Sequence, residues 1–254
     1  MTEEVTRKTV IITGSGKGIG RAIALKLAPL PYNLVLNYLA DHESAHEVLL
    51  LCKSITPHVL LIQADIAKRS DAERLIDEAY ETFKSVDVLI NNAGHNIDKP
   101  MSELTDEDWD RVIDTNMKGV FLCSQRASSY MLQQPQGGII LNVGSTTSMR
   151  GRVNGLNYCA SKAGVLIMTK CMAQELAPHV RVNCLIPGWT NTAEVHHRVG
   201  LADPETFRSV MGRIPLHRLA ETEEMANVAK FLLSDDAKYI TGQKIIVDGG
   251  EYML

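Results

Sequence analysis

Residues 8–27 read KTVIITGSGKGIGRAIALKL, and this stretch decides how the chain folds. Residues 8–13 form a short β-branched apolar run that ends at glycines, which is typical of a buried strand in a parallel sheet. The glycine-rich turn that follows opens an amphipathic helix, and Pro29 and Pro31 terminate that helix. The stretch therefore predicts a strand, a tight turn and a helix in immediate succession.

The same alternation of strand and helix recurs along the rest of the chain. Apolar runs predict further strands at residues 33–38, 58–63, 86–90, 138–143, 180–185 and 243–247. Helical spacing of apolar residues predicts the main helices at residues 43–53, 105–133, 156–177 and 222–233. Because the connections are too long for hairpins, the sequence predicts an α/β fold, a single Rossmann domain over residues 1–254. Its sheet is a doubly wound, seven-stranded parallel sheet with helices on both faces.

Two helix starts carry the pattern of a capping box, in which a hydroxyl residue precedes an acid by three positions. The pairs are Ser70 with Glu73 and Thr105 with Asp108. Residues 188–216 are instead polar and irregular, with only a weak helical pattern. Because a long insertion in a compact domain is usually functional, we expect this segment to form a lid over the substrate.

Composition narrows the class of protein. The 254 residues are 45% hydrophobic and 22% charged, which suits one large α/β domain, and the net charge of −4 indicates no nucleic-acid or membrane-surface partner. The N-terminus lacks a signal-peptide core and no apolar run approaches about 18 residues, so we expect a cytoplasmic protein. No cysteine has metal-ligand spacing, and we expect buried free thiols at Cys52, Cys123, Cys159, Cys171 and Cys184.

The glycine-rich turn at residues 13–20, TGSGKGIG, is a candidate site for a pyrophosphate. Gly14 can adopt backbone angles that other residues avoid, and Gly18 and Gly20 allow the helix start to approach a phosphate closely. The free N–H groups and the dipole of the helix then favour the anion. An ordinary glycine-rich turn is the alternative, but the strand before it and the helix after it favour a dinucleotide. The other predicted contacts in this turn are Ser15, Lys17 and Ile19.

The choice between NADP and NAD depends on the tip of the second strand. A Rossmann unit that binds NAD needs an acid there for the ribose 2′-hydroxyl, and this chain has Asn37 and Tyr38 instead. Asp41 follows a few residues later, where it is either that ligand or only a surface acid. Lys17 lies near the place that a 2′-phosphate would occupy. We therefore predict that NADP(H) is preferred and NAD(H) is possible, with Tyr38 in contact with the cofactor.

Two further strand ends supply candidate contacts to the cofactor. Asp65 follows the third strand, and it either accepts a hydrogen bond from the adenine amino group or caps a helix; Ile66 is the next residue. The fourth strand ends in NNAG, residues 91–94, whose small residues would let the backbone pass close to the cofactor. The predicted contacts in this segment are Asn92, Ala93 and Gly94.

A serine, a tyrosine and a lysine form a candidate proton-transfer device. Tyr158 and Lys162 are four residues apart and therefore share one helical face, and Ser145 ends an apolar strand. A free phenol has a pKa near ~10 and is a poor base at neutral pH, but an adjacent ammonium favours the phenolate and lowers that pKa. Ser145 could then bind a substrate oxygen while Tyr158 moves its proton. A solvated helix face is the alternative interpretation of the pair.

With these residues identified, nearly the whole chain resembles the classical short-chain dehydrogenase/reductase family. The matching motifs are the glycine turn, NNAG, the serine thirteen residues before the tyrosine in NVGS, YCASK (158–162), the asparagine of DTNMKGVF (114–121) and IPGWTNT (186–192). Any one of these motifs is moderate support. All of them together, in this order, are very specific.

The resemblance implies a role for each catalytic candidate. Tyr158 would be the general acid in reduction and the base in oxidation, and Ser145 would hold the substrate oxygen. Lys162 would lower the pKa of Tyr158 and bind the nicotinamide ribose. Asn116 would support a proton relay from Lys162. Its position on the apolar stripe of its helix, seven residues after Trp109, independently marks it as unusual, although a hydrogen-bonded core amide is the alternative.

The resemblance also assigns the segment after the sixth strand. Pro187 and Gly188 would lie behind the nicotinamide. Thr190 and Thr192 would lie near its carboxamide and the pyrophosphate. Arg150 and Arg152 precede Tyr158 on a loop, where they either hold an anionic substrate or are simply exposed arginines.

The C-terminal part, residues 217–254, resembles β-ketoacyl acyl-carrier-protein reductases, although many sugar and polyol dehydrogenases of the family share most of it. Those reductases dock their acidic carrier through basic residues near the site. Here the segment before the fifth strand (131–138) has no Lys or Arg, and the segment before the sixth offers only His179.

These observations lead to one expected function and two alternatives. We expect an NADP(H)-preferring oxidoreductase that interconverts a carbonyl and a secondary alcohol, similar to a 3-oxoacyl thioester reductase. The alternatives are a sugar, polyol or other small-alcohol dehydrogenase and, from another class, a non-catalytic cofactor-binding redox sensor or scaffold. The resemblance implies a homotetramer that pairs helices 105–133 and 156–177 across two-fold axes, with a small-molecule substrate as the other partner.

Overall fold

The computed structural model describes residues 7–253, whose seven strands form one parallel sheet in the order β3-β2-β1-β4-β5-β6-β7. The strands are β1 (Lys8–Ile12), β2 (Tyr32–Tyr38), β3 (Val59–Gln63), β4 (Val88–Asn91), β5 (Gly138–Val143), β6 (Val180–Pro187) and β7 (Lys244–Val247). The order reverses between β1 and β4, so the predicted doubly wound parallel sheet is confirmed. Ligands of such sheets bind at the carboxyl ends of the strands beside this reversal.

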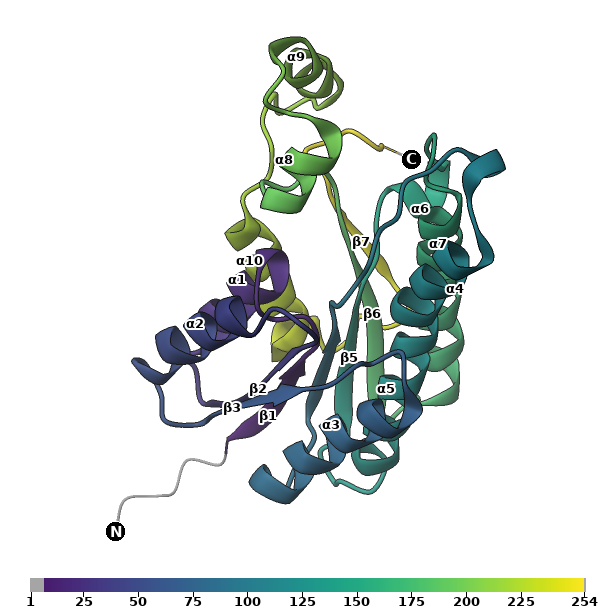
Figure 1. The fold of residues 1–254 in the computed structure, drawn as a ribbon. Helices are drawn as coiled ribbons and strands as arrows, with labels where there is room; N and C mark the ends of the chain where they lie inside the picture. The colour runs from purple at the N-terminus through teal and green to yellow at the C-terminus, as the bar shows by residue number, and fades with distance from the viewer. Residues whose placement is uncertain (1–6, 254) are drawn as a thin grey trace.

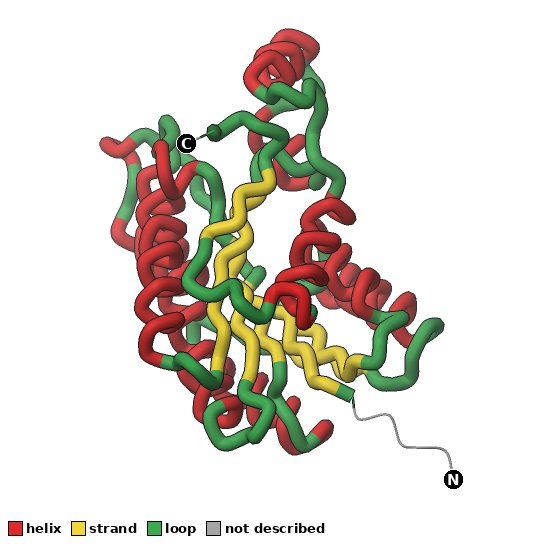
Figure 2. The backbone as a smooth tube through the Cα atoms, turned by 180° about the vertical axis from the view of Figure 1, so that it is seen from behind, coloured by secondary structure: helices red, strands yellow, loops and turns green. Residues whose placement is uncertain are grey.

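Helices cover both faces of the sheet (Figures 1 and 2). They are α1 (Gly18–Leu27), α2 (His42–Lys53), α3 (Arg69–Phe83), α4 (Asp106–Ile113), α5 (Gly119–Met131), α6 (Thr147–Arg150), α7 (Leu156–Glu175), α8 (Ala193–Val199), α9 (Pro204–Arg213) and α10 (Thr222–Leu233). Short turns of other helix types are η1 (Met101–Glu103), η2 (Asp114–Lys118) and η3 (Asp235–Ala237).

Alternate residues of each central strand serve the two helical layers. In β1, Val10 and Ile12 pack with α1, α2 and α10, whereas Ile11 packs with α3, α5 and α7. All three side chains are completely buried. Because a fully buried aliphatic side chain of this size stabilises a fold by about 1.5–3 kcal/mol, this double burial explains why the strands appear as continuous apolar runs in the sequence.

One of the two predicted capping boxes is present. Thr105 accepts from the Asp108 backbone N–H and the Asp108 side chain accepts from that of Thr105, so the start of α4 is confirmed. The box at Ser70 is wrong, because α3 begins one residue earlier at Arg69 and no side chain caps it. Glu73 pairs with Arg69 instead, at 3.0 Å.

The helix expected over residues 105–133 is divided by the π-helical turn η2. This wider turn separates α4 from α5 and carries Asn116, which is completely buried. Such insertions in helices often occur at functional sites.

The segment at residues 188–216 is more ordered than expected, because it contains α8 and α9. Leu201, Val210, Ile214 and Leu219 form a small core of their own beneath these helices. The two helices project beyond the carboxyl edge of the sheet, above the rest of the molecule in Figure 1. We call residues 188–216 the lid.

Cysteine burial follows the prediction only in part. Cys52, Cys123 and Cys184 are buried free thiols, but Cys159 is half-buried and Cys171 is exposed, since it lies on the outer side of α7. Burial raises the pKa of the Cys123 thiol to about 12. Within residues 7–253, no cluster of His, Cys, Asp and Glu could hold a metal ion, and no helix has the length and apolarity to cross a membrane.

Candidate active site

The predicted phosphate turn between β1 and α1 packs its backbone too closely for a side chain at Gly14 and at Gly20. Gly14 has a φ of +62°, and a Cβ atom there would lie 2.8 Å from the Ala93 Cα. Gly18 has a φ of +55° and faces the methyl group of Thr192 across the groove. The turn, the NNAG segment and the start of the lid therefore converge. Backbone without side chains at a helix start is what a dinucleotide pyrophosphate requires, so these residues fit a nucleotide cofactor.

Polar side chains lock this turn to the end of β4. The Thr13 hydroxyl accepts hydrogen bonds from the backbone N–H groups of Asn92 and Ala93, each at 3.0 Å. The Asn92 side-chain amide donates to the carbonyls of Thr13 at 3.0 Å and Gly14 at 2.9 Å. Asn92, predicted as a cofactor contact, thus uses its side chain to hold the turn. The role of Thr13 was missed, because a threonine at a strand end carries no distinctive pattern.

Substituting Gly14 with alanine should destabilise the protein. The positive φ and the 2.8 Å approach to the Ala93 backbone act together, so we expect a loss of about 2 kcal/mol or more in unfolding free energy and weaker NADPH binding. Chemical denaturation and NADPH fluorescence titration measure the two effects. Gly16→Ala is the matched control, because a Cβ there meets Ala45 at an ordinary 3.4 Å without positive φ. Equal losses in both variants would contradict this account of the turn.

The tip of β2 is neutral, as predicted, and its polar groups serve the backbone. Asn37 is buried, accepts from the Gly14 N–H at 3.2 Å and donates to the Ala64 carbonyl at 3.1 Å. The Ser15 hydroxyl is also buried and donates to the Asn37 carbonyl at 3.2 Å. Ser15, predicted to contact the cofactor, therefore directs its side chain away from the groove and into the fold.

Two charged and two aromatic side chains flank this strand tip on the outside. Lys17 and Asp41 form an exposed ion pair at 3.7 Å, and their side chains are 79% and 45% exposed. Tyr38 packs edge-on against the His42 ring, with 5.6 Å between centroids. The Asp41 carboxylate also accepts from the Ser44 N–H at 3.1 Å and so caps α2, and a contact to the cofactor ribose stays a prediction.

Asp65 takes part in the local structure that follows β3. Its carboxylate accepts from the Ala67 N–H at 3.1 Å, and its own N–H donates to Asp71 at 2.9 Å. The Asp65 carboxylate thus closes a local turn ahead of α3 and does not cap that helix, whose N-cap is Lys68, so the capping interpretation is wrong and an adenine contact stays a prediction. Ile66 is buried against Gly119, where a Cβ would lie 2.8 Å from the isoleucine Cδ1.

Ser145, Tyr158 and Lys162 meet where β5 ends and α7 begins. Lys162 is 4% exposed, and its ammonium donates to the Val143 carbonyl at 2.8 Å and lies 6.0 Å from the centroid of the Tyr158 ring. Burial lowers the pKa of Lys162 to about 8. Burial also raises the pKa of the Tyr158 phenol, and a hydrogen bond from Ser145 opposes that rise. Ser145 in turn lies 3.0 Å from the Thr147 hydroxyl.

Asn116 ties the π turn to the loop after β4 and to α7. Its amide accepts from the His95 N–H at 2.6 Å and donates to the His95 carbonyl at 2.9 Å and the Ser161 hydroxyl at 3.0 Å. A Cβ at Gly94 would lie 3.5 Å from the Asn116 Oδ1 and 3.6 Å from the Lys162 Nζ. The amide of Asn116 and the ammonium of Lys162 therefore border the same small space.

Two buried polar residues of α7 were missed by sequence reasoning. Ser161 donates to the Tyr158 carbonyl at 2.7 Å and receives the Asn116 amide. Asn157 accepts from the Tyr158 N–H at 2.7 Å and donates to the Asp108 carbonyl at 3.3 Å. Their position could have indicated this role, because both are small polar residues on the helix face that also carries Tyr158 and Lys162.

The end of β6 and the start of the lid close the groove. A Cβ at Gly188 would lie 2.5 Å from the Asp248 Cβ, so only glycine fits there. Thr190 is buried and forms a bridge with Ala220. Thr192 accepts from the Val195 N–H at 3.2 Å and so caps α8. Pro187, the last residue of β6, is paired with Val247 of β7.

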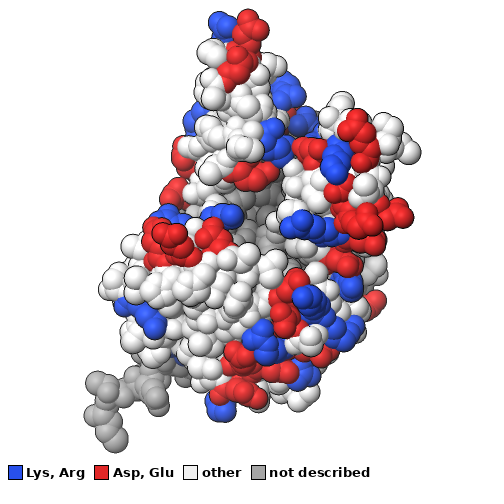
Figure 3. Space-filling model, in the orientation of Figure 1, with Lys and Arg blue, Asp and Glu red and all other residues white. Residues whose placement is uncertain are grey.

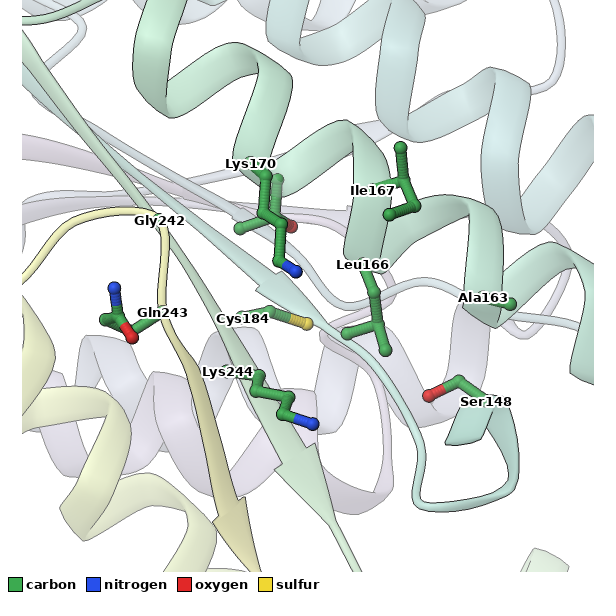
Figure 4. A pocket seen from close by; sticks show the side chains of 10 residues that line it. Ser148, Ala163, Leu166, Ile167, Lys170, Cys184, Gly242, Gln243 and Lys244 are labelled. Atoms are coloured by element: carbon green, nitrogen blue, oxygen red, sulfur yellow. The ribbon is translucent and has the colours of Figure 1, made fainter. Parts of the chain in front are cut away.

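A separate pocket of about 220 Å³ lies between α7 and the edge strand β7 (Figure 4). Its walls include Leu166 and Ile167, with Lys170 and Lys244 beside the buried Cys184. None of the four predicted catalytic residues lines it. Burial raises the pKa of the Cys184 thiol to about 12, so this thiol is not a nucleophile at neutral pH.

Comparisons with known proteins agree with this geometry. The family model described as enoyl-(acyl carrier protein) reductase matches residues 14–251. The 3-oxoacyl-(acyl-carrier-protein) reductase FabG of Staphylococcus epidermidis is 41% identical over 97% of this chain and 99% of its own. The 3β-hydroxysteroid dehydrogenase 1 of Eggerthella lenta is 36% identical over 98% of this chain and 95% of its own. The crystal structure of a short-chain dehydrogenase/reductase, glucose/ribitol dehydrogenase, from Brucella melitensis has a TM-score of 0.88 at 34% identity and covers 97% of each chain.

Proposed function

The chain belongs to the short-chain dehydrogenase/reductase family and is an NAD(P)-dependent oxidoreductase acting on CH–OH groups, and we propose that it prefers NADP(H) and reduces a 3-oxoacyl thioester or a related carbonyl. The observation that carries the proposal is the meeting of Ser145, Tyr158 and a buried Lys162 on the edge of the sheet that also carries the glycine turn. A protein that only bound a dinucleotide would need no such proton-transfer group.

The residues of this chain handle the substrate oxygen and its proton. When bound, the dinucleotide supplies or accepts the hydride. The Ser145 hydroxyl donates a hydrogen bond to the substrate oxygen, and Tyr158 gives its proton to that oxygen in reduction or removes it in oxidation. The Lys162 ammonium stabilises the resulting phenolate. Burial raises the pKa of Tyr158, and the nearby guanidinium groups of Arg198 and Arg152 oppose that rise.

Further cofactor roles follow from the same motifs. We propose that Lys162 and Tyr158 also hold the nicotinamide ribose, and that the proton of Tyr158 is replaced through Lys162 and the Asn116 turn. The space shared by Asn116, Gly94 and Lys162 supports this relay. Pro187 and Gly188 are proposed to lie behind the nicotinamide.

The preference for NADP(H) rests on Lys17 and on the neutral tip of β2. Replacing Lys17 with glutamine should raise KM for NADPH about five- to tenfold and KM for NADH less than about twofold, because a hydrogen bond between charged groups is worth about 1.5–3 kcal/mol before solvent screening reduces it. Arg21→Gln, one turn further along α1, is the charge-matched control. Steady-state kinetics with both cofactors make the test. A wild-type protein with a strong preference for NADH would overturn the proposal.

The carbonyl class is proposed from the likeness to the staphylococcal reductase at 41% identity. The segments before β5 and β6, which lack Lys and Arg and offer only His179, adjoin each other through the Gly138 N–H and the His179 carbonyl at 3.0 Å. They lie at the amino ends of these strands, opposite Tyr158, so they do not line the site of the same chain. A sugar or polyol is the second candidate, supported by the 34% identity to the glucose/ribitol enzyme.

We also propose a cytoplasmic homotetramer. Large apolar side chains are exposed on the helices expected to pair, including Phe121 on α5 at 43% and Ile167 on α7 at 59%. Burying apolar side chains of this size against a second copy of the chain favours association. Gel filtration with light scattering should give about four times the 28.0 kDa chain mass. A monomer would contradict this assembly.

A further inference from the structure

An Arg-Gly-Arg turn stands between the ends of α6 and α7, and its two arginines bind different carboxylates. Gly151 has a φ of +70°, which reverses the chain between the arginines. The Arg152 guanidinium donates hydrogen bonds to both carboxylate oxygens of Asp98, and its Nη2 lies 2.5 Å from Oδ1. Arg150 donates to the Glu251 carboxylate at 2.9 Å. Each carboxylate comes from a distant segment, one from the loop after β4 and one from the C-terminal turn.

Each of these carboxylates also faces an arginine of the lid. The Asp98 Oδ2 lies 3.7 Å from the Arg198 Nη1 on α8. The Glu251 Oε1 lies 4.0 Å from the Arg213 Nε at the end of α9. Figure 1 shows the C-terminal segment running between the lid and α6, and Figure 3 shows charged groups on both rims of the hollow below the lid. The lid is thus joined to the turn by two Arg–carboxylate–Arg bridges.

The bridges flank the reactive centre. The Arg152 guanidinium lies 5.3 Å from the centroid of the Tyr158 ring. The Arg213 guanidinium lies 5.2 Å from the Trp189 ring, next to the segment proposed to back the nicotinamide. A Cβ at Gly155 would meet Arg152 at 2.7 Å, so the chain leaves room for this arginine at the start of α7. Arg152 also donates to Asn96 at 2.6 Å, which fixes its plane.

We propose that Asp98 and Glu251 are positioning residues that hold the lid over Tyr158, by bridging the arginines of the turn to Arg198 and Arg213. The predicted effect on turnover rests on the proposed function. The contact between the lid and the turn does not depend on that function. The lid has its own small core. Its position over the site therefore depends on contacts such as these bridges rather than on burial in the main core.

The two contacts of each bridging carboxylate differ in length, and this difference indicates which contact breaks first. The carboxylates lie 2.5 Å and 2.9 Å from the arginines of the turn, but 3.7 Å and 4.0 Å from the arginines of the lid. The Glu251 side chain is 2% exposed and its Oε2 finds no hydrogen-bond partner within residues 7–253, so its charge needs the close Arg150. When the lid moves, the carboxylates therefore stay with the turn and the lid arginines separate from them. Salt should promote this step, because the Debye length falls from about 10 Å at 0.1 M to about 3 Å at 1 M.

Hydrogen exchange of the lid tests the proposal without substrate or cofactor. The double variant Arg198→Gln/Arg213→Gln should exchange backbone hydrogens of α8 and α9 about tenfold faster than the wild type, and 1 M NaCl should speed exchange in the wild type but hardly at all in the variant. Asp98→Asn and Glu251→Gln, which cut the bridges from the other side, should reproduce the effect. Glu73→Gln, which breaks the exposed 3.0 Å pair with Arg69 on α3, is the control and should leave lid exchange unchanged.

Turnover supplies the second readout. If the bridges position the lid, the double variant should show a several-fold higher KM for the carbonyl with a smaller change in kcat, and the salt dependence of KM seen in the wild type should be lost. Lid exchange that is insensitive both to salt and to all four charge removals would overturn the proposal. That result would leave the oxidoreductase function standing, whereas a salt-sensitive lid on a protein without turnover would refute only the function.

Discussion

Replacing Tyr158 with phenylalanine should lower kcat by about three to four orders of magnitude, the upper part of the range for loss of a general acid–base group. The ring remains and the packing around it is preserved, while the only proton that the mechanism moves is lost. NADPH affinity should fall by no more than about fivefold, because only one hydrogen bond to the nicotinamide ribose, worth about 1 kcal/mol, is lost and the glycine turn proposed to bind the pyrophosphate is untouched. Following NADPH absorbance during turnover and NADPH fluorescence during titration separates the two effects.

A second tyrosine provides the control. Tyr130 on α5 donates its hydroxyl to Asp77 at 2.9 Å, far from the proposed site. Tyr130→Phe should therefore keep kcat within about twofold while losing about 1 kcal/mol of stability with its hydrogen bond. If Tyr158→Phe retained wild-type turnover, the proton would have to come from elsewhere and the proposed mechanism would be refuted.

Replacing Lys162 with methionine should abolish turnover and yet make the folded protein more stable. Burial lowers the pKa of Lys162 from 10.5 to about 8, which corresponds to about 3 kcal/mol of unfavourable charge burial at neutral pH. The substitution removes this penalty and leaves the Val143 carbonyl without its 2.8 Å donor, at a cost of about 1 kcal/mol. We therefore expect a net gain of about 2 kcal/mol in unfolding free energy at pH 7.

The pH dependence of this gain identifies its cause. Between pH 8 and 10.5 the folded wild type has released the Lys162 proton while the unfolded chain still holds it, so raising the pH favours the folded state. The penalty is present in full below pH 8 and is relieved as the pH rises through that window. The stability advantage of Lys162→Met should thus shrink from pH 7 to pH 10 in parallel denaturation curves. A variant that is less stable than the wild type at pH 7 would show that the buried ammonium of Lys162 does not destabilise the folded protein.

Most of the fold could be predicted because the sheet is buried on both faces. For this reason the apolar run at 180–185 could be predicted as a strand, and the observed strand β6 is two residues longer, ending at Pro187. The π-helical turn η2 could not be predicted from the sequence, because Trp109, Val112 and Val120 keep helical spacing across it. Its extra residue is accommodated by tertiary contacts of Asn116. The lid helices were also missed, because their short apolar faces pack on each other rather than on the sheet.

Some residues of the candidate site could be predicted from the sequence, whereas the hydrogen-bond partners of others could not. Glycines and the Tyr-Lys pair were predictable, since few other residues permit a positive φ or share one helical face. The partners of Asn92 and Ser15 were not, because an amide or a hydroxyl at a strand end can reach either a ligand or the backbone. Here both reach the backbone, in the turn and at the tip of β2. Only the three-dimensional arrangement distinguishes these outcomes.

The central claim is that this chain transfers hydride between NADP(H) and a carbonyl by means of Tyr158. A screen that follows NADPH and NADH absorbance, with acetoacetyl thioesters beside sugars, polyols and simple ketones, tests it most directly when the wild type and Tyr158→Phe are run in parallel. We predict NADPH-dependent turnover of at least one class by the wild type, faster than with NADH, and turnover about three to four orders of magnitude slower by the variant. A wild type that binds NADPH with micromolar affinity but turns over no compound of the panel would contradict the claim.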